Sequence, residues 1–282
     1  MTSDQWISGD IRDPEACNRA AKGTCVAIHA AGEKVHEGIM YAVNVEGTNN
    51  LLHASLRNKV GLFIYISSVG VIGAPPLKKK KWDEDAECRP SNTYEYSKWQ
   101  GEQKVREASV RGLTTVILRP TNVFGDRDSS KGLLSLLRNV RDGRFIFIGG
   151  RNCACNFIFV DDVAHAVLSV IKSAKAPFTI RHVADPCKIG EFVDAIADNL
   201  GVKRPRLVMP YLFAELMRTV LCPLSRLSSV SRSAIYSRWT TLNNQAIFIS
   251  KLLNDQSDFA HTVGWHQGVK RLVHWYRCRG EL

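Results

Sequence analysis

A short apolar run that ends in two serines, followed by a helical segment with a tyrosine and a lysine, constrains this chain most strongly. The run is Leu62–Ile66, the serines are Ser67 and Ser68, and the pair is Tyr94 and Lys98. Residues four apart share one face of a helix, so a phenol and an ammonium placed there can do acid–base chemistry. We expect Lys98 to lower the pKa of Tyr94 from its free value of about 10. Ser68, leaving a buried strand, is expected to bind the same substrate oxygen. Taken alone, such a pair is more often a solvated helical contact.

Other motifs accompany the pair in a fixed order. Tyr94 and Lys98 lie in Asn-x-Tyr-x-x-Ser-Lys, and Arg-Pro-Thr-Asn-Val-Phe-Gly follows at 119–125. In this order the sequence resembles the extended short-chain dehydrogenases/reductases, which include NAD-dependent epimerases, dehydratases and 3β-hydroxysteroid dehydrogenases. The resemblance runs from Gly9 to about Arg277, and it is specific in the ensemble of motifs. It implies an α/β fold, a Rossmann-like doubly wound parallel sheet that is N-terminally truncated, with a small C-terminal α/β substrate lobe. Residues 1–176 would form the cofactor domain and 177–282 mainly the lobe, with interleaved elements.

The resemblance also implies roles for individual residues. Tyr94 would take the proton of a substrate hydroxyl, Lys98 would lower its pKa and hold the nicotinamide ribose, and Ser68 would orient the oxygen. Asn122 would contact the diphosphate of a nucleotide sugar. The position that aligns with a phosphate-binding arginine of sugar-nucleotide members is Cys155, so Arg151 is the nearest substitute.

The cofactor implied is NAD or NADP, with NAD favoured. Small residues after a strand let a ligand approach the backbone at the carboxyl edge of a parallel sheet. The candidate cofactor residues are Asp10 on the adenine side, Ile11, Ala30, Ala31, Gly32, Lys98 and Pro120. Asp13-Pro14 nearby equally suits the start of a helix over 15–21.

Members of the family hold the pyrophosphate with a Gly-x-x-Gly-x-x-Gly turn. The early glycines here are isolated, at 9, 23, 32, 38 and 47. By motif alignment, the first strand, first helix and second strand are absent. We therefore expect a gap or a rearranged edge in the sheet, and weak NAD binding by this chain.

Periodicity and turn residues predict the remaining elements. Strands are expected near 6–7, 26–32, 114–118 and 178–180, the last as part of the lobe. Helices are expected over 44–52, 94–110, 189–200 and at the end of the chain, 263–276. His29 and Asn44 are expected to have structural roles, and Asp162 to cap or brace a helix.

The formal charge of +11 over 282 residues directs attention to anionic partners. The lysine run 78–81 is followed at once by acidic residues and predicts a solvated loop, so no nucleic-acid role is expected. The spacings of the eight cysteines form no regular disulfide framework. Cys25 and Cys222 lie in apolar sequence and are expected to be buried thiols. No metal site is expected, and a reducing cytoplasm is the expected location. The apolar stretch 207–221 is too short and interrupted to span a bilayer; it could pack in the core, line a pocket or touch a membrane surface. A homodimer is a further expectation.

Three functions remain open from the sequence. The first is a sugar-nucleotide epimerase, dehydratase or reductase. The second is a 3β-hydroxysteroid or sterol dehydrogenase, favoured by Ile72, where sugar epimerases usually have Tyr, and by the stretch 207–221. The third is a binding protein built on a catalytically impaired fold.

Overall fold

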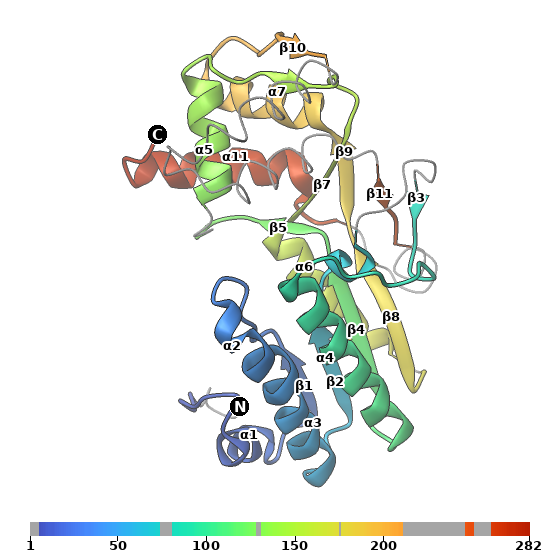
Figure 1. Ribbon diagram of the computed structural model, residues 1–282. Helices are drawn as coiled ribbons and strands as arrows, with labels where there is room; N and C mark the ends of the chain where they lie inside the picture. Colours follow the sequence, from blue (N-terminus) through green and yellow to red (C-terminus); the bar gives the residue numbers. More distant parts are fainter. Residues whose placement is uncertain (1–5, 74–80, 128–130, 175, 211–245, 251–260) are drawn as a thin grey trace.

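Four parallel strands form the central sheet of the computed structural model, which describes residues 6–73, 81–127, 131–174, 176–210, 246–250 and 261–282 (Figure 1). The strands are β1 (Val26–His29), β2 (Leu62–Ile66), β4 (Thr115–Pro120) and β8 (Phe178–Val183), in the order β1-β2-β4-β8. Ile64 of β2 pairs with both Ile28 and Val116 across the sheet. The parallel α/β sheet expected from the sequence is confirmed.

Helices cover both faces of this sheet because its strands are apolar on both faces. Phe63 and Tyr65 pack against α1 (Pro14–Ala21), α3 (Thr48–Arg57) and α4 (Thr93–Val110). Ile64 and its sheet neighbours pack against α6 (Val160–Ser173) on the other face. The sheet is therefore doubly wound.

Strand β1 is the edge of the described sheet. The four strands adjoin one another, so the gap that was one of the two expectations does not occur within the described sheet. Ile28 at the centre of β1 is 49% exposed. This apolar edge residue is less covered than the central strand β2, whose Phe63 and Ile64 are fully buried.

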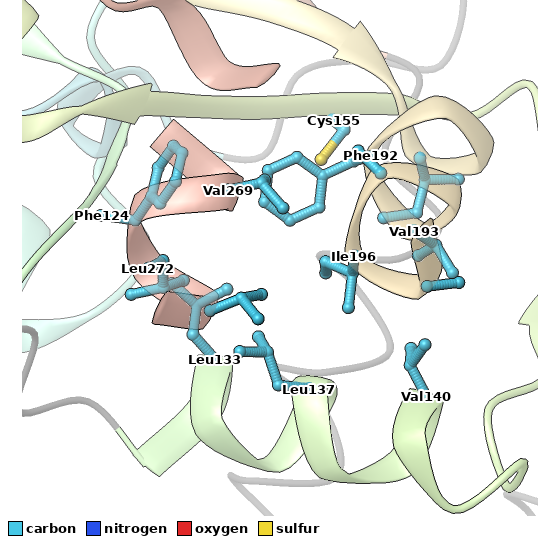
Figure 2. Packing of buried hydrophobic residues seen from close by; sticks show 14 of the residues in the cluster. Phe124, Leu133, Leu137, Val140, Cys155, Phe192, Val193, Ile196, Val269 and Leu272 are labelled. Atoms are coloured by element: carbon cyan, nitrogen blue, oxygen red, sulfur yellow. The ribbon is translucent and has the colours of Figure 1, made fainter. Parts of the chain in front are cut away.

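A smaller lobe packs around its own core, which Figure 2 shows. Its sheet has the order β5-β7-β9, with β5 (Asn122–Phe124) parallel and β9 (Asp185–Lys188) antiparallel to β7 (Ala154–Phe159). Three helices enclose the core: α5 (Lys131–Arg141), α7 (Ile189–Leu200) and α11 (Gly264–Cys278). Leu137, Phe192, Ile196, Val269 and Leu272 from these helices meet there.

Short elements complete the described chain. Two-residue parallel pairs join β6 (Phe147–Ile148) to β10 (Val208–Met209) and β3 (Lys81–Trp82) to β11 (Ile247–Phe248). The remaining helical turns are α2 (Glu37–Tyr41), the π-helix η1 (Ala42–Gly47) and the 3-10 helix η2 (Val69–Ile72).

Local signals predicted several elements well. The α1 helix begins as expected, with Pro14 in its first turn and Asp13 accepting a hydrogen bond from the Glu15 amide. Helix α7 spans the predicted 189–200.

Three expectations are wrong. Trp6 and Ile7 are exposed and form no strand, and Cys25 is exposed rather than buried. Strand β8 hydrogen-bonds along the whole of β4 and so belongs to the central sheet rather than to the lobe, because long-range pairing overrides its position in the sequence. Cys222 and most of the stretch 207–221 lie outside the described residues, and the domain boundary at 176 stays a prediction.

Candidate active site

Ser68 lies just beyond the buried end of β2. Its Oγ accepts a hydrogen bond from the Gly70 amide at 3.0 Å and so starts the η2 turn. In that bond Ser68 uses a lone pair, which leaves its hydroxyl proton able to reach a substrate oxygen. The short turn fixes the direction in which the serine leaves the sheet.

Tyr94 and Lys98 lie on successive turns of α4. The helix begins at Thr93 because the Asn92 side chain accepts from the Glu95 amide at 2.9 Å. Lys98 is 4% exposed, and its Nζ donates to the Ile66 carbonyl at 2.7 Å. Because Ile66 ends β2 two residues before Ser68, this bond holds the Tyr94 helix at the strand end from which Ser68 emerges.

Burial controls the ionisation of both site residues. It lowers the pKa of Lys98 from 10.5 to about 8, while the carboxylate of Glu102 opposes the change. Burial, with the nearby Glu95, raises the pKa of Tyr94. The pKa of Tyr94 therefore moves upward overall, opposite to the expected direction, because desolvation of the phenol is the largest effect on it.

A buried ion pair between Arg119 and Glu102, which the sequence did not predict, links the elements that carry the site. Arg119 donates to Glu102 through Nε at 2.9 Å and through Nη2 at 2.7 Å, and Ser67 Oγ donates to the same carboxylate at 2.6 Å. The pair thus joins β4, α4 and the residue before Ser68. Glu102 lies one helical turn after Lys98, and this spacing was the sequence signal that could have placed the Glu102 carboxylate near the site.

Asn44 links the loop after β1 to the same helix. Its amide donates to Ser97 Oγ at 2.9 Å and to the Glu33 carbonyl at 2.8 Å, and its oxygen accepts from the Glu33 amide. The Asn44 carbonyl accepts from Thr48 Oγ1, which in turn contacts His29 Nε2 at 2.9 Å. Burial and the charge of Lys98 lower the pKa of His29 to about 3, so this histidine is neutral. The structural roles expected of Asn44 and His29 agree with these contacts.

The candidate cofactor residues divide into two groups. Ala30, Ala31 and Gly32 are exposed at the carboxyl end of β1. A Cβ added to Gly32 would lie 3.3 Å from Asn44 Oδ1 and 3.9 Å from Lys98 Nζ. The structure thus brings the small residues and Lys98 together, as a ligand contacting both requires.

The other group has structural contacts. Arg12 engages both oxygens of the Asp10 carboxylate and lowers its pKa to about 2. Ile11 packs beneath Gly47, where an added Cβ would lie 2.7 Å from Ile11 Cγ2. Pro120 is buried in β4, opposite Val183.

The two candidate substrate residues differ in availability. Asn122 is exposed on β5, close in sequence to the end of β4. Arg151 pairs with Asp194 at 2.6 Å and also donates to the Pro205 carbonyl. Its guanidinium braces the lobe, which leaves Asn122 as the more open of the two.

Asp162 has the bracing role expected of it, but the helix that it braces is α11 and not its own helix α6. It lies in the first turn of α6, but its carboxylate accepts from the amides of Thr262, Val263 and Gly264 at the start of α11. Within the described ranges, Asp162, Asp185 and His261 are the three potential metal-ligand residues whose ligand atoms lie within 4.8 Å of one another. The hydrogen bonds from three backbone amides satisfy the buried Asp162 carboxylate.

Together these residues can move a proton at a substrate oxygen. Ser68 offers a donor and Lys98 a buried ammonium at the carboxyl end of β2, and Tyr94 offers a phenol one helical turn before Lys98. Open α/β sheets bind ligands at this end of their strands.

Comparisons with known proteins agree in family and fold. The model of the 3-beta hydroxysteroid dehydrogenase/isomerase family matches residues 1–202. The N-acetyl-alpha-D-glucosaminyl-diphospho-ditrans,octacis-undecaprenol 4-epimerase of Escherichia coli O157:H7 is 30% identical over 214 residues, 72% of this chain and 63% of that protein. The 3beta-hydroxysteroid-dehydrogenase/decarboxylase isoform 2 of Arabidopsis thaliana is 28% identical over 291 residues, 95% of this chain and 51% of that protein.

Among solved structures, UDP-glucuronic acid 4-epimerase from Bacillus cereus in complex with NAD superposes with a TM-score of 0.70 at 15% identity, over 93% of this chain and 78% of that one. This likeness concerns the fold. The chain spans between about half and two thirds of the length of the curated relatives it matches. Within the described part of the chain, no helix has the length and apolar character needed to cross a membrane.

Proposed function

This chain belongs to the 3-beta hydroxysteroid dehydrogenase/isomerase family of the extended short-chain dehydrogenases/reductases, and we propose that it is an NAD(P)-dependent oxidoreductase acting on a ring hydroxyl of a diphosphate-linked sugar. The observation that carries the proposal is the bond between Lys98 Nζ and the Ile66 carbonyl. It supports a single site built from the Tyr94 helix and the Ser68 turn.

Proton transfer is the task of the chain's own residues. Tyr94 accepts the proton of the substrate hydroxyl as a carbonyl forms, and returns it in the reverse direction. Ser68 donates a hydrogen bond to the same oxygen and so holds it beside the phenol. Lys98, held by the Ile66 carbonyl, places a positive charge where it stabilises the phenolate during transfer. Bound NAD(P) would supply the hydride acceptor.

Two features support a nicotinamide ribose beside Lys98. A Cβ on Gly32 would crowd Asn44 Oδ1 at 3.3 Å and touch Lys98 Nζ at 3.9 Å, so the glycine leaves more room for a ligand beside these side chains. Ala30 and Ala31 continue the same exposed small-residue segment. Asp10 remains a proposed adenine contact, although binding there would have to compete with Arg12.

The substrate class rests on the exposed Asn122 and on the sugar-diphosphate epimerase relative. A 3β-hydroxysteroid is the second candidate, supported by the Arabidopsis relative that aligns with 95% of this chain. Ile72, which favoured the steroid in the sequence, is 2% exposed and packs with the core cluster of η2, β3 and β11. Ile72 therefore carries little weight for a pocket.

Turnover by the full chain tests the proposal. The protein is incubated at high NAD+ with UDP-galactose or UDP-N-acetylglucosamine, and separately with a 3β-hydroxysteroid. Epimer formation is followed by NMR and NADH release by absorbance. Tyr94→Phe should reduce turnover about 100- to 10,000-fold, whereas Tyr96→Phe, a matched change at an exposed position of the same helix, should not.

Each outcome decides between the candidates. Turnover of the steroid alone would replace the sugar by the second candidate. Failure to turn over either class, or full activity of Tyr94→Phe, would refute the oxidoreductase proposal and favour a binding protein. Circular dichroism of both variants confirms that they are folded.

A further inference from the structure

Two cysteines face each other across the lobe sheet, away from the proposed active site. In the antiparallel pairing of β7 with β9, Cys155 lies directly opposite Cys187. Both are free thiols, and they lie close enough for Cys187 to raise the pKa of Cys155. Their side chains therefore lie on the same face and point toward each other.

The backbone pairing suits a covalent link. The Ile189 amide donates to the Cys153 carbonyl at 2.9 Å, which makes 153 and 189 a hydrogen-bonded pair. Such pairs alternate every two residues along an antiparallel ladder, so Cys155 and Cys187 occupy the next hydrogen-bonded position. The Cα atoms of such pairs are about 5.5 Å apart, within the separation that disulfides usually span. Their Cβ atoms also lie about 5.5 Å apart, so closure must draw the two strands together by about 1 Å.

The two thiols differ in access. Cys155 is 4% exposed and lies in the lobe core beside Phe192 (Figure 2). Cys187 is partly buried and packs on the edge of that core. The neighbouring Cys187 and burial raise the pKa of Cys155, so Cys155 keeps its proton, while the less buried Cys187 is the thiol that a reagent in solution reaches first.

We propose that Cys155 and Cys187 form a modification site that closes to a cross-strand disulfide by exchange with a small disulfide such as oxidised glutathione. The Cys187 thiolate attacks one sulfur of the oxidant, forming a mixed disulfide and releasing one glutathione thiolate. The Cys155 sulfur then attacks the Cys187 sulfur, its proton passes to the solvent, and the second glutathione leaves. Two protein thiols are oxidised as one glutathione disulfide is reduced to two glutathiones.

Closure would tie together segments that are distant along the chain. Between the two cysteines lie α6 and β8 of the central sheet. The link constrains the unfolded chain over this segment, and it fixes the strand that leads from β8 into α7. This site is separate from the proton-transfer residues, so it goes beyond the proposed function.

Thiol trapping on the full chain tests the pair. The folded protein is equilibrated with oxidised and reduced glutathione, remaining thiols are alkylated, and the peptides are identified by mass spectrometry. Wild type should yield a Cys155–Cys187 linked peptide that dithiothreitol removes. Oxidation should raise the melting temperature of wild type by roughly 5 °C.

Single substitutions separate the two steps. In Cys155→Ser, Cys187 should stop at the mixed disulfide and carry one glutathione, whereas in Cys187→Ser the buried Cys155 should stay unmodified. Cys153→Ser is the matched control on the same strand, because position 153 lies opposite Ile189, and it should close as wild type does. A fully oxidising mixture that leaves both thiols free, or that links either of them to Cys153 or to a second chain, would overturn the proposal.

Discussion

The buried ion pair between Glu102 and Arg119 gives the sharpest test of how the site is held. Both side chains are 3% exposed, and two hydrogen bonds join them. Ser67 donates a third bond to the carboxylate. Replacing Arg119 by Met removes the cation that donates to Glu102 and leaves this buried carboxylate with the hydrogen bond from Ser67.

The magnitude follows from these contacts. Each hydrogen bond to a charged group contributes about 1.5–3 kcal/mol, and breaking a buried pair by removing one partner costs about 3–5 kcal/mol. Arg119 Nη1 is buried without a hydrogen-bond partner in the structure, so losing the arginine also removes one unsatisfied donor. We therefore expect Arg119→Met to lower the free energy of unfolding by about 3 kcal/mol, at the lower end of that range.

A double-mutant cycle isolates the pair. Glu102→Leu combined with Arg119→Met removes both members of the pair at once, and should cost less than the sum of the single changes by about 2 kcal/mol or more, because neither is left buried without the other. Urea denaturation measures each free energy of unfolding. Glu107→Gln is the control on the same helix; it breaks the exposed pair with Lys104 and should cost less than about 0.5 kcal/mol.

Additivity would refute this reasoning. If the two single changes simply sum, or if Arg119→Met costs no more than Glu107→Gln, then the pair is not desolvated in the way its burial indicates. A change in the denaturant slope of one variant alone would point instead to an altered unfolded state.

Three further predictions concern the same region. Lys98 has a pKa of about 8 in the folded protein against 10.5 ordinarily, so the unfolded chain binds the extra proton between these values. The free energy of unfolding of wild type should therefore rise relative to Lys98→Met as pH increases from about 8 to 10.5, by up to roughly 3 kcal/mol; a difference that stays constant in urea titrations across this range would contradict the lowered pKa. Gly101→Ala would place a Cβ 2.4 Å from Tyr65 Oη and 2.9 Å from the Asn44 carbonyl. It should lower the free energy of unfolding, measured by thermal unfolding, by about 2 kcal/mol despite the better helix propensity of alanine. Gly132→Ala in α5, where the added Cβ has no neighbour within 4 Å, is the control and should not lower it. NADH fluorescence titrated with the full chain should reveal weak binding, because the early glycines form no pyrophosphate-binding turn, and micromolar affinity would show the expectation wrong.

Local chemistry explains what the sequence could predict. Helix ends depend on neighbours within a few residues, so Asp13 and Pro14 predicted the start of α1. Buried parallel strands have a simple composition, which located β2 and β4. The spacing of Tyr94 and Lys98, with Ser68 after a strand, predicts that these residues share a site, and the bond from Lys98 to the Ile66 carbonyl agrees with that prediction without testing it.

Contacts between distant segments decided the rest. Sequence carries no measure of burial, so the raised pKa of Tyr94 and the lowered pKa of Lys98 appear only once α4 is packed against the sheet. The partnership of Glu102 with Arg119, the capping of α11 by Asp162, and the place of β8 beside β4 each join residues far apart along the chain. Such pairings depend on which elements lie side by side, and only the tertiary structure determines that.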